Sequence, residues 1–380
     1  ETVTRETDRP FYSVPCLDNP GAREPADLAS YIEELLGTRT SSLCWPRLEG
    51  KPVIWTYAGT NMPAARWNET LNLLKGKGLE IAVILDANSL FAQAEPQGNA
   101  ADPWDGLPVA ELDALADLPV ALYAFRTDFD RQTMERCLSY LRDRHPDSLA
   151  ARLSIGTVWP GYWSLGSGWL VDPQCTGLIR DTFYQAREAH WLTVTTWNDF
   201  YETTHFQPSI GFGTGRLDLL HALLSRWRGG ASWPREPRLY LWQPNEIQAS
   251  DEVRGEVLAL LPDGAGPAQM RVSLCDAQGA VSGEGTLQTL PGAGVHAADF
   301  AIPAPDAAPG TCLYLRLDYD IAHAEQSVLS QPICVWPAGY HPLATPRGTM
   351  WQVGSQARGP QTVVMEQTGG VPSRLTTAWE

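Results

Sequence analysis

The chain has 380 residues, of which 43% are hydrophobic and 19% charged. This length favours two domains, and this composition excludes a disordered chain, a collagen and a coiled coil. The formal net charge is -16, which is the wrong sign for a surface that binds the phosphate backbone of nucleic acid. No apolar run approaches the ~20 residues of a membrane-spanning helix. We therefore expect neither a nucleic-acid partner nor a membrane span.

Strand and helix patterns alternate over the first 230 residues. Six apolar runs read as strands, at residues 11–15, 52–57, 80–85, 120–125, 153–158 and 191–197. Helical patterns lie between them, at residues 26–36, 61–78, 131–144 and 175–189. This alternation predicts a parallel sheet that is buried on both faces. Six β/α units are two fewer than a (β/α)8 barrel needs. An open doubly wound sheet fits that count as it stands, although no GxGxxG follows the first strand.

The pattern changes to short alternating strands at about residue 237. These strands are expected at residues 238–242, 254–261, 268–275, 294–301, 312–319 and 326–336. Regular short strands separated by turn residues predict an immunoglobulin/fibronectin-like β-sandwich. We therefore predict an α/β domain over 1–232 and a β-sandwich domain over 237–337. Residues 338–380 are either a linker or the start of a further β domain.

Seven cysteines are scattered along the chain, without a CxxC pair or an HExxH motif. We expect no metal site and no cofactor. Cys275, Cys312 and Cys334 fall in the predicted sandwich. The sequence permits one disulfide among them but does not establish it. The chain begins without an initiator Met or a signal-peptide pattern, as expected of a processed or partial chain.

The densest group of polar and aromatic residues lies at 191–209, WLTVTTWNDFYETTHFQPS. Asp199 and Glu202 stand three residues apart, just after a predicted parallel strand. The carboxyl ends of such strands carry the active site in α/β barrels and open sheets. Two neighbouring carboxylates suit glycoside hydrolysis, with one as acid and the other acting on water or on the sugar. The alternative is an Asp that caps a helix and a Glu on its solvated first turn.

Other predicted strands also end in polar or aromatic residues. Tyr57, Asp86 and Arg126 each follow an apolar strand, and residues 154–163 (SIGTVWPGYW) form an aromatic loop. The 15 tryptophans serve either as core packing or as rings that stack on sugars. Several such strand ends together indicate a pocket ringed by loops.

Three strings in this chain resemble glycoside hydrolase family 71, the α-1,3-glucanases. They are GKPVIWTYAG, ILDA and TWNDFYETTHFQPS, and the WND-x-x-E core falls at Trp197, Asn198, Asp199 and Glu202. The string WPGY at 159–162 is closer to the related family 99, the endo-α-mannosidases. The resemblance covers residues 10–215 approximately. It implies a (β/α)8-type (TIM) barrel that lacks its first two β/α units in this chain, and Tyr201 stands where the family pattern has Gly.

The resemblance implies a secreted glycoside hydrolase, extracellular or periplasmic, that degrades an α-linked polysaccharide in carbohydrate metabolism. The substrate would be α-1,3-glucan or α-mannan. We assign Glu202 as general acid and Asp199 as its partner base. The expected substrate-binding residues are Tyr57, Asp86, Arg126, Trp159, Tyr162, Trp197, Asn198, Tyr201 and His205.

Two other interpretations stay open at this stage. One is a glycan-binding protein on the same scaffold that keeps the aromatic cleft without turnover. The other is a structural subunit, for example of a homo-oligomer, whose neighbouring chains supply the missing strands. A barrel without those strands would leave open sheet edges.

Overall fold

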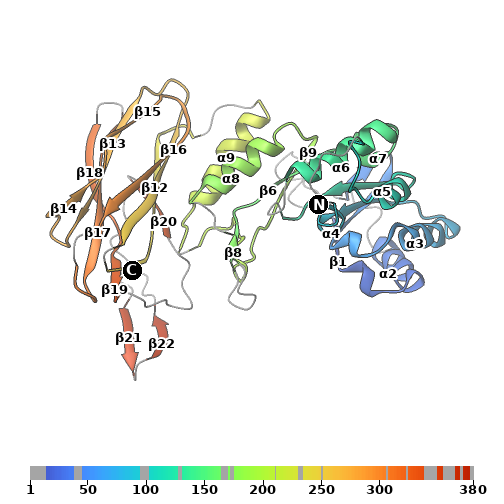
Figure 1. The fold of residues 1–380 in the computed structure, drawn as a ribbon, viewed down its shortest axis with the longest axis horizontal. Helices are drawn as coiled ribbons and strands as arrows, with labels where there is room; N and C mark the ends of the chain where they lie inside the picture. The colour runs from blue at the N-terminus through green and yellow to red at the C-terminus, as the bar shows by residue number, and fades with distance from the viewer. Residues whose placement is uncertain are drawn as a thin grey trace. The chain divides into compact units, whose positions relative to one another are not determined.

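The computed structural model divides the chain into two compact units (Figure 1). Unit 1 comprises Glu1–Trp159 and Ile179–Thr196, and unit 2 comprises Pro160–Leu178 and Trp197–Glu380. The structure describes residues 14–37, 45–94, 102–126, 131–163, 170–171, 175–209, 211–229, 234–249, 251–304, 307–321, 324–337, 349–353, 364–368 and 371–376. The predicted domain boundary near residue 232 lies inside unit 2. Within the described ranges, none of the helices has the length and apolar character to cross a membrane.

Unit 1 is built on parallel strands. Its main sheet has the order β1 (Cys16–Asp18), β3 (Lys51–Tyr57), β4 (Ala82–Asp86), β5 (Val120–Tyr123), with β2 (Arg47–Leu48) antiparallel to β3. A second parallel pair, β6 (Ile155–Val158) and β9 (Trp191–Val194), continues beside β5. The expected parallel α/β arrangement is confirmed. The predicted first strand begins later than expected, at Cys16, and residues 11–13 of that prediction lie outside the described residues.

Four of the main helices of unit 1 follow the predicted ranges closely, and a fifth, at residues 109–116, was not predicted. They are α2 (Pro25–Gly37), α3 (Ala64–Gly76), α5 (Val109–Ala116), α6 (Arg131–Arg144) and α8 (Gly177–Ala186). Shorter turns are η1 (Pro20–Ala22), η2 (Gly59–Asn61), α4 (Asn88–Phe91) and α7 (Leu149–Arg152). Helices α2 and α3 lie side by side (Figure 1).

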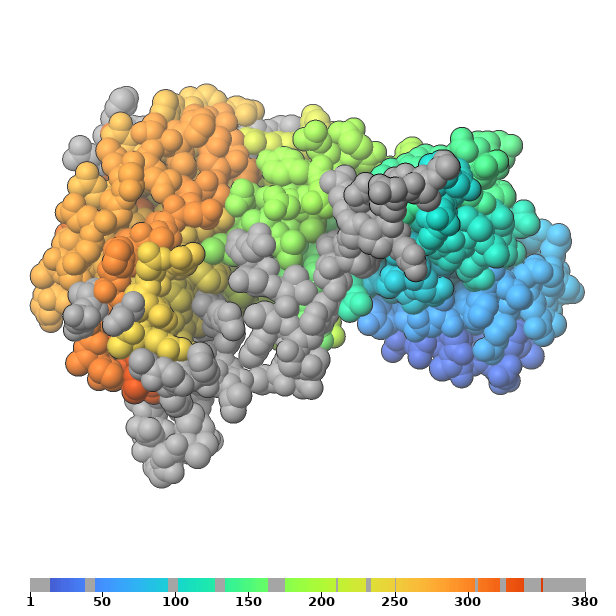
Figure 2. Space-filling model, viewed as in Figure 1, coloured from blue at the N-terminus to red at the C-terminus, as the bar shows by residue number. Residues whose placement is uncertain are grey.

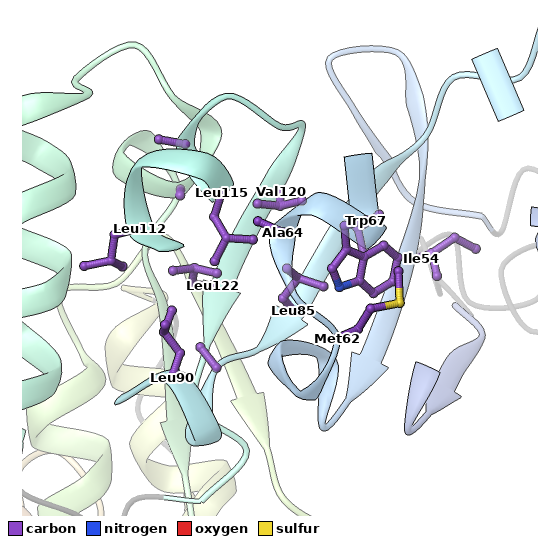
Figure 3. Close-up of a cluster of buried hydrophobic side chains, with 14 of the residues drawn as sticks. Ile54, Met62, Ala64, Trp67, Leu85, Leu90, Leu112, Leu115, Val120 and Leu122 are labelled. Carbon is purple, nitrogen blue, oxygen red and sulfur yellow. The ribbon is translucent and has the colours of Figure 1, made fainter. Parts of the chain in front are cut away.

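Both faces of the unit 1 sheet are buried. Ile54, Leu85 and Leu122 point into a core that also holds Trp67 of α3 (Figure 3). The Trp67 ring is fully buried, and its Nε1 donates to the Gly59 carbonyl at 3.0 Å. The alternate residues of the same strands, such as Ile84, enter a second cluster on the other face. This is why the strands read as continuous apolar runs rather than as alternating ones.

The described strands of unit 1 do not close into a barrel. In this part of the chain β1 pairs only with β3, and β9 pairs only with β6. Among the described strands, each outer strand thus has a neighbour on one side, and a barrel that lacks two β/α units stays a prediction.

Unit 2 contains two larger sheets that share one core. The first has the order β16 (Gly294–Pro303), β12 (Glu252–Leu261), β10 (Arg238–Gln243), β20 (Thr349–Val353), and its pairs are antiparallel. The second has the order β11 (Glu246–Gln248), β19 (Ile333–Trp336), β17 (Cys312–Ile321), β13 (Ala268–Cys275), β14 (Val281–Glu284), with β15 (Gln288–Leu290) and β18 (Ala324–Leu329) beside them. Buried side chains of both sheets form a single cluster. In Figure 2 the yellow and orange atoms of this part of the chain adjoin on the face shown.

The remaining strands of unit 2 are short. The predicted strand 326–336 is two strands, β18 and β19, with Pro332 between them. Strand β20 lies in the predicted linker but pairs with β10. The other pairs are β7 (Tyr162–Trp163) with β8 (Leu170–Val171), and β21 (Val364–Thr368) with β22 (Val371–Thr376). The immunoglobulin/fibronectin-like type of the β region stays a prediction.

Helix α9 (Gly215–Trp227) is anchored to the first sheet of unit 2. Its Asp218 accepts hydrogen bonds from Arg238 Nη1 at 2.8 Å and from the Tyr240 hydroxyl. At Gly215 an added Cβ would lie 2.4 Å from the Met350 sulfur, so helix and strand approach closely here and a larger residue would require the Met350 side chain to move. The segment leading into α9 is therefore held by the β-rich unit.

Candidate active site

The loop at residues 197–207 follows β9 in the chain and closes on itself. The amides of Phe206 and Gln207 both donate to the Trp197 carbonyl, at 3.2 and 2.8 Å. A turn inside the loop ends at Thr203, whose φ of 58° is in the left-handed region. Non-glycine residues adopt that conformation rarely. The loop is thus a closed structure with a constrained turn at its centre.

Asp199 and Glu202 lie together in this loop. The Glu202 amide donates to Asp199 Oδ1 at 2.9 Å, so Asp199 caps a turn, as the helix-capping alternative foresaw, but no helix follows it. Burial is the main cause that raises the pKa of Glu202, and the nearby Asp199 charge raises it further. A hydrogen bond from Tyr162 of β7 acts in the opposite direction. The structure therefore brings both predicted carboxylates and Tyr162 into one cluster.

Three aromatic side chains of the same loop face solvent. Trp197 is 55% exposed, Phe200 49% and Tyr201 67%. Asn198, between the first two, is also exposed. Large apolar rings are normally buried, so a run of exposed rings marks a binding surface. Phe200 was not among the predicted site residues, although its place between the two acids could have signalled it.

His205 is packed inside the loop rather than presented to a ligand. It is 4% exposed, and its ring lies 4.3 Å from that of Phe200 and 5.5 Å from that of Phe212. Its Nε2 is 3.1 Å from the Ser209 hydroxyl. Burial, with a smaller contribution from the Arg216 charge, lowers the pKa of His205 to about 4. His205 is therefore neutral at neutral pH, and its position supports the loop; a contact with substrate stays a prediction.

Arg216 is a residue of the site that the sequence did not reveal. It begins α9, is 4% exposed, and donates to the carbonyls of Thr203 at 2.7 Å and His205 at 3.1 Å. Its guanidinium carbon lies 3.7 Å from the centre of the Phe212 ring. Burial lowers the pKa of Arg216 to about 9, so it stays charged at neutral pH. The turn that contains Glu202 is thus attached to helix α9 through the side chain of Arg216.

A second group of predicted residues gathers in unit 1, at the carboxyl ends of β3, β4 and β5. Asp86 is 2% exposed and accepts hydrogen bonds from the amides of Ala58, Asn88 and Phe125, at 2.9, 3.2 and 3.1 Å. Burial raises the pKa of Asp86, and these three amides act against that effect, as does the charge of Arg126. Asp86 therefore ties three strand ends together, and a contact with sugar stays a prediction.

Tyr57 and Arg126 lie at the same edge of unit 1 and are more open than Asp86. Tyr57 is exposed and packs edge-on against Phe125, with ring centres 4.6 Å apart. Trp159, in contrast, is 1% exposed, and its amide donates to the Thr182 hydroxyl at 3.1 Å. A sugar could not stack on Trp159 without opening this packing. The predicted residues thus form one group in unit 1 and another in unit 2.

The search for a metal centre and a described hollow both lead away from these groups. In the ranges that the structure describes, no three His, Cys, Asp or Glu side chains are arranged to hold a metal ion. A hollow of about 660 Å³ in unit 1 is lined by Trp104, Asp113, Tyr140 and His145, among others. It shares no residue with the predicted site.

Comparison with known proteins gave matches only among solved structures. No family model and no curated protein matches this chain. A GH99 endo-α-mannosidase from Bacteroides thetaiotaomicron, in complex with bis-tris-propane, is 15% identical with a TM-score of 0.44, covering 56% of this chain and 69% of that one. Another structure of the GH99 endo-α-mannosidase from Bacteroides thetaiotaomicron is also 15% identical with a TM-score of 0.41, covering 56% and 65%. The periplasmic chaperone SfaE is 12% identical with a TM-score of 0.22, covering 26% and 58%. Because these TM-scores lie below 0.5, the chemistry of the site is argued from its own residues.

Proposed function

We propose that the chain is a glycoside hydrolase that cleaves an α-linked polysaccharide, α-1,3-glucan or α-mannan, with Asp199 and Glu202 as its catalytic carboxylates. The observation that carries this proposal is the raised pKa of Glu202, which burial and the adjacent Asp199 cause. A carboxyl group whose pKa is raised beside a second carboxylate is suited to the role of general acid. The exposed rings of Trp197, Phe200 and Tyr201 supply a surface for sugar rings.

In this proposal Glu202 is the general acid. A raised pKa keeps its carboxyl protonated to higher pH than an ordinary Glu, so it holds a proton for the leaving glycosidic oxygen. Asp199 is the base, acting on a water molecule or on a hydroxyl of the sugar itself. One of its oxygens is already oriented by the Glu202 amide. Trp197 and Tyr201 stack on the sugar, and Tyr162 orients the Glu202 carboxyl.

The same proposal covers the scaffold and its setting. The parallel strands of unit 1 support a (β/α)8-type barrel that lacks two β/α units in this chain. The two sheets of unit 2 with their shared core support an immunoglobulin/fibronectin-like accessory sandwich. An extracellular or periplasmic location follows from a polysaccharide substrate. The chemistry of a carboxylate pair needs no cofactor.

The test is hydrolysis of α-1,3-glucan and of α-1,2- and α-1,6-mannans, with the anomeric form of the first product followed over time. Glu202→Gln and Asp199→Asn should each reduce product release by about 10²–10⁴-fold, the usual contribution of a general acid or base. Glu236→Gln and Asp263→Asn, at exposed carboxylates of unit 2, are matched controls and should retain the rate. Product release that survives both site variants would exclude Asp199 and Glu202 as the catalytic carboxylates, and a wild type that releases no product from any of these glycans would end the hydrolase proposal.

A second candidate is a glycan-binding protein without turnover. The open edges at β1 and β9 and the exposed rings favour it, because a binding surface needs stacking but no closed pocket. Calorimetric titration with the same glycans separates the two. Binding that is lost in Trp197→Ala and Tyr201→Ala, with no product from the wild type, would favour this candidate. Sedimentation of the intact chain tests the homo-oligomer, in which neighbouring chains would cover those edges.

A further inference from the structure

Two cysteines face each other on the second sheet of unit 2. In the antiparallel pair of β17 and β19, Cys312 lies directly opposite Cys334, followed by Leu313 opposite Ile333. Leu313 and Ile333 are buried in the core, so the cysteines point to the outer face of the sheet. Accordingly Cys312 is exposed and Cys334 half-buried, and both are free thiols.

The hydrogen bonds around the pair show which kind of site it occupies. The Cys334 amide donates to the Asn245 carbonyl at 3.0 Å, away from β17, while the amide of the next residue, Val335, donates to the carbonyl of Thr311, the residue just before β17, at 2.9 Å. Cys312 and Cys334 therefore form a non-hydrogen-bonded pair, in which opposite Cα atoms are typically ~4.5 Å apart. Disulfides bridge Cα separations of ~4.4–6.8 Å. The backbone is thus already in position for a bond.

The side chains meet as well. The Cys312 thiol lies close enough to Cys334 to contribute to the raised pKa of that residue. Burial, the Cys312 side chain and the carboxylate of Glu246 raise the pKa of Cys334. Cys334 is therefore held as a thiol beside its partner, and the exposed Cys312 is the one that a reagent meets first.

We propose that Cys312 and Cys334 are a disulfide-forming pair, oxidised by exchange with a small-molecule disulfide. The Cys312 thiolate attacks one sulfur of the reagent, whose S–S bond breaks and releases one thiolate. Cys334 then gives up its proton and attacks the Cys312 sulfur of the mixed disulfide, releasing the second thiolate. The protein loses two protons and two electrons, and the reagent is reduced to two thiols.

The bond would secure a weak point of unit 2. Strand β19 joins β17 through the two pairs Cys312–Cys334 and Leu313–Ile333, and it also carries β11. A covalent link here holds β11, β19 and β17 together and restricts the unfolded chain. The other exposed described cysteine, Cys16, lies opposite Trp55 and has no such partner. This inference is independent of the proposed function.

The test is to treat the intact chain with oxidised glutathione, block remaining thiols with N-ethylmaleimide, and map the peptides by mass spectrometry. No Lys or Arg separates Cys275 from Cys312, so trypsin must be combined with a protease that cuts before Asp, including at Asp299. We expect the Cys312 and Cys334 peptides to be joined and to separate on reduction. In Cys334→Ala, Cys312 should instead keep glutathione. Cys16→Ala is the matched control and should form the bond as the wild type does.

Two results would overturn the proposal. One is a wild type in which both cysteines are alkylated after oxidation, or in which Cys312 keeps glutathione as in Cys334→Ala. The other is a melting temperature of unit 2 that falls on oxidation, because a bond that fits the folded strands should raise it. Cys312→Ala should show no shift in either direction. These readouts need no substrate, so their failure leaves the hydrolase proposal untouched.

Discussion

Asp86 offers a test that separates a structural carboxylate from a sugar contact. Its Oδ2 accepts the Ala58 amide, and its Oδ1 accepts the amides of Asn88 and Phe125. Asp86→Asn keeps the shape and one acceptor oxygen, which can serve the two amides at the Oδ1 position. The new NH2 group then faces the Ala58 amide, so two donors oppose each other. Asp86→Ala removes both acceptor oxygens and with them all three hydrogen bonds.

The magnitudes follow from the number of amides left without a partner. An unsatisfied buried donor costs about 1–3 kcal/mol. Asp86→Asn strands one amide and should lower the free energy of unfolding of unit 1 by about 1–2 kcal/mol. Asp86→Ala leaves three amides without a partner, and we expect it to lower the free energy of unfolding by at least about 3 kcal/mol. This value uses the lower end of the cost per amide, because these hydrogen bonds are only partly buried. Both variants also remove the buried charge, so that effect cancels in the difference between them.

Urea unfolding and amide hydrogen exchange measure the effect. Exchange at residues 58, 88 and 125 should rise most in Asp86→Ala. Asp117→Asn, at an exposed aspartate of the same unit, is the matched control and should stay within about 0.5 kcal/mol of the wild type. If Asp86→Asn and Asp86→Ala are as stable as the wild type yet lose glycan binding, Asp86 acts on the ligand and the structural argument is wrong.

Three further predictions concern unit 2. In a carbon-13 NMR titration Glu202 should titrate above the usual range of Glu, and Asp199→Asn should lower its midpoint, because a neighbouring negative charge is removed; an unchanged midpoint would leave burial as the sole cause. Arg216→Met removes both donors to the loop carbonyls, so amide exchange at residues 203–206 should accelerate about tenfold or more; equal exchange rates would contradict the positioning role. Gly255→Ala would place a Cβ 2.3 Å from the Phe300 ring and 2.4 Å from the Trp242 carbonyl oxygen, and urea unfolding should show a loss of about 1–3 kcal/mol, whereas an unchanged midpoint would show that the ring and the neighbouring backbone both shift freely.

Local sequence patterns were sufficient to predict the helices and strands whose ends are marked by proline or by a similarly restrictive residue. The helix expected at 131–144 has those bounds in the structure, because its apolar spacing is followed closely by Pro146, which a helix cannot easily include. The helix expected at 61–78 is shorter, beginning at Ala64. Pro63 fixes an extended backbone before it, and Ala58 in the left-handed region starts a separate 3₁₀ turn. The apolar run of β4 was read correctly because both of its faces are buried.

The candidate site was predictable in its residue types but not in its supports. Acids and rings beside a strand end are visible in the sequence, and Asp199 and Glu202 do lie together. Whether a side chain is offered to a ligand or used by the fold depends on residues far along the chain. Asp86 is saturated by amides from β3 and β5, and Trp159 is covered through a segment that includes Thr182.

Arg216 is the clearest case of a site residue that the sequence alone could not identify. As a single basic residue in the first turn of a helix, it resembles a solvated surface residue, since arginine is rarely buried without a partner. The structure buries it because two carbonyls of a left-handed turn and the Phe212 ring converge on that point. The helix itself is held against strand β10, because Asp218 accepts hydrogen bonds from Arg238 and Tyr240, about twenty residues later in the chain. A loop that follows a strand of unit 1 in sequence is therefore held by the β-rich unit, because its long-range hydrogen bonds are made there.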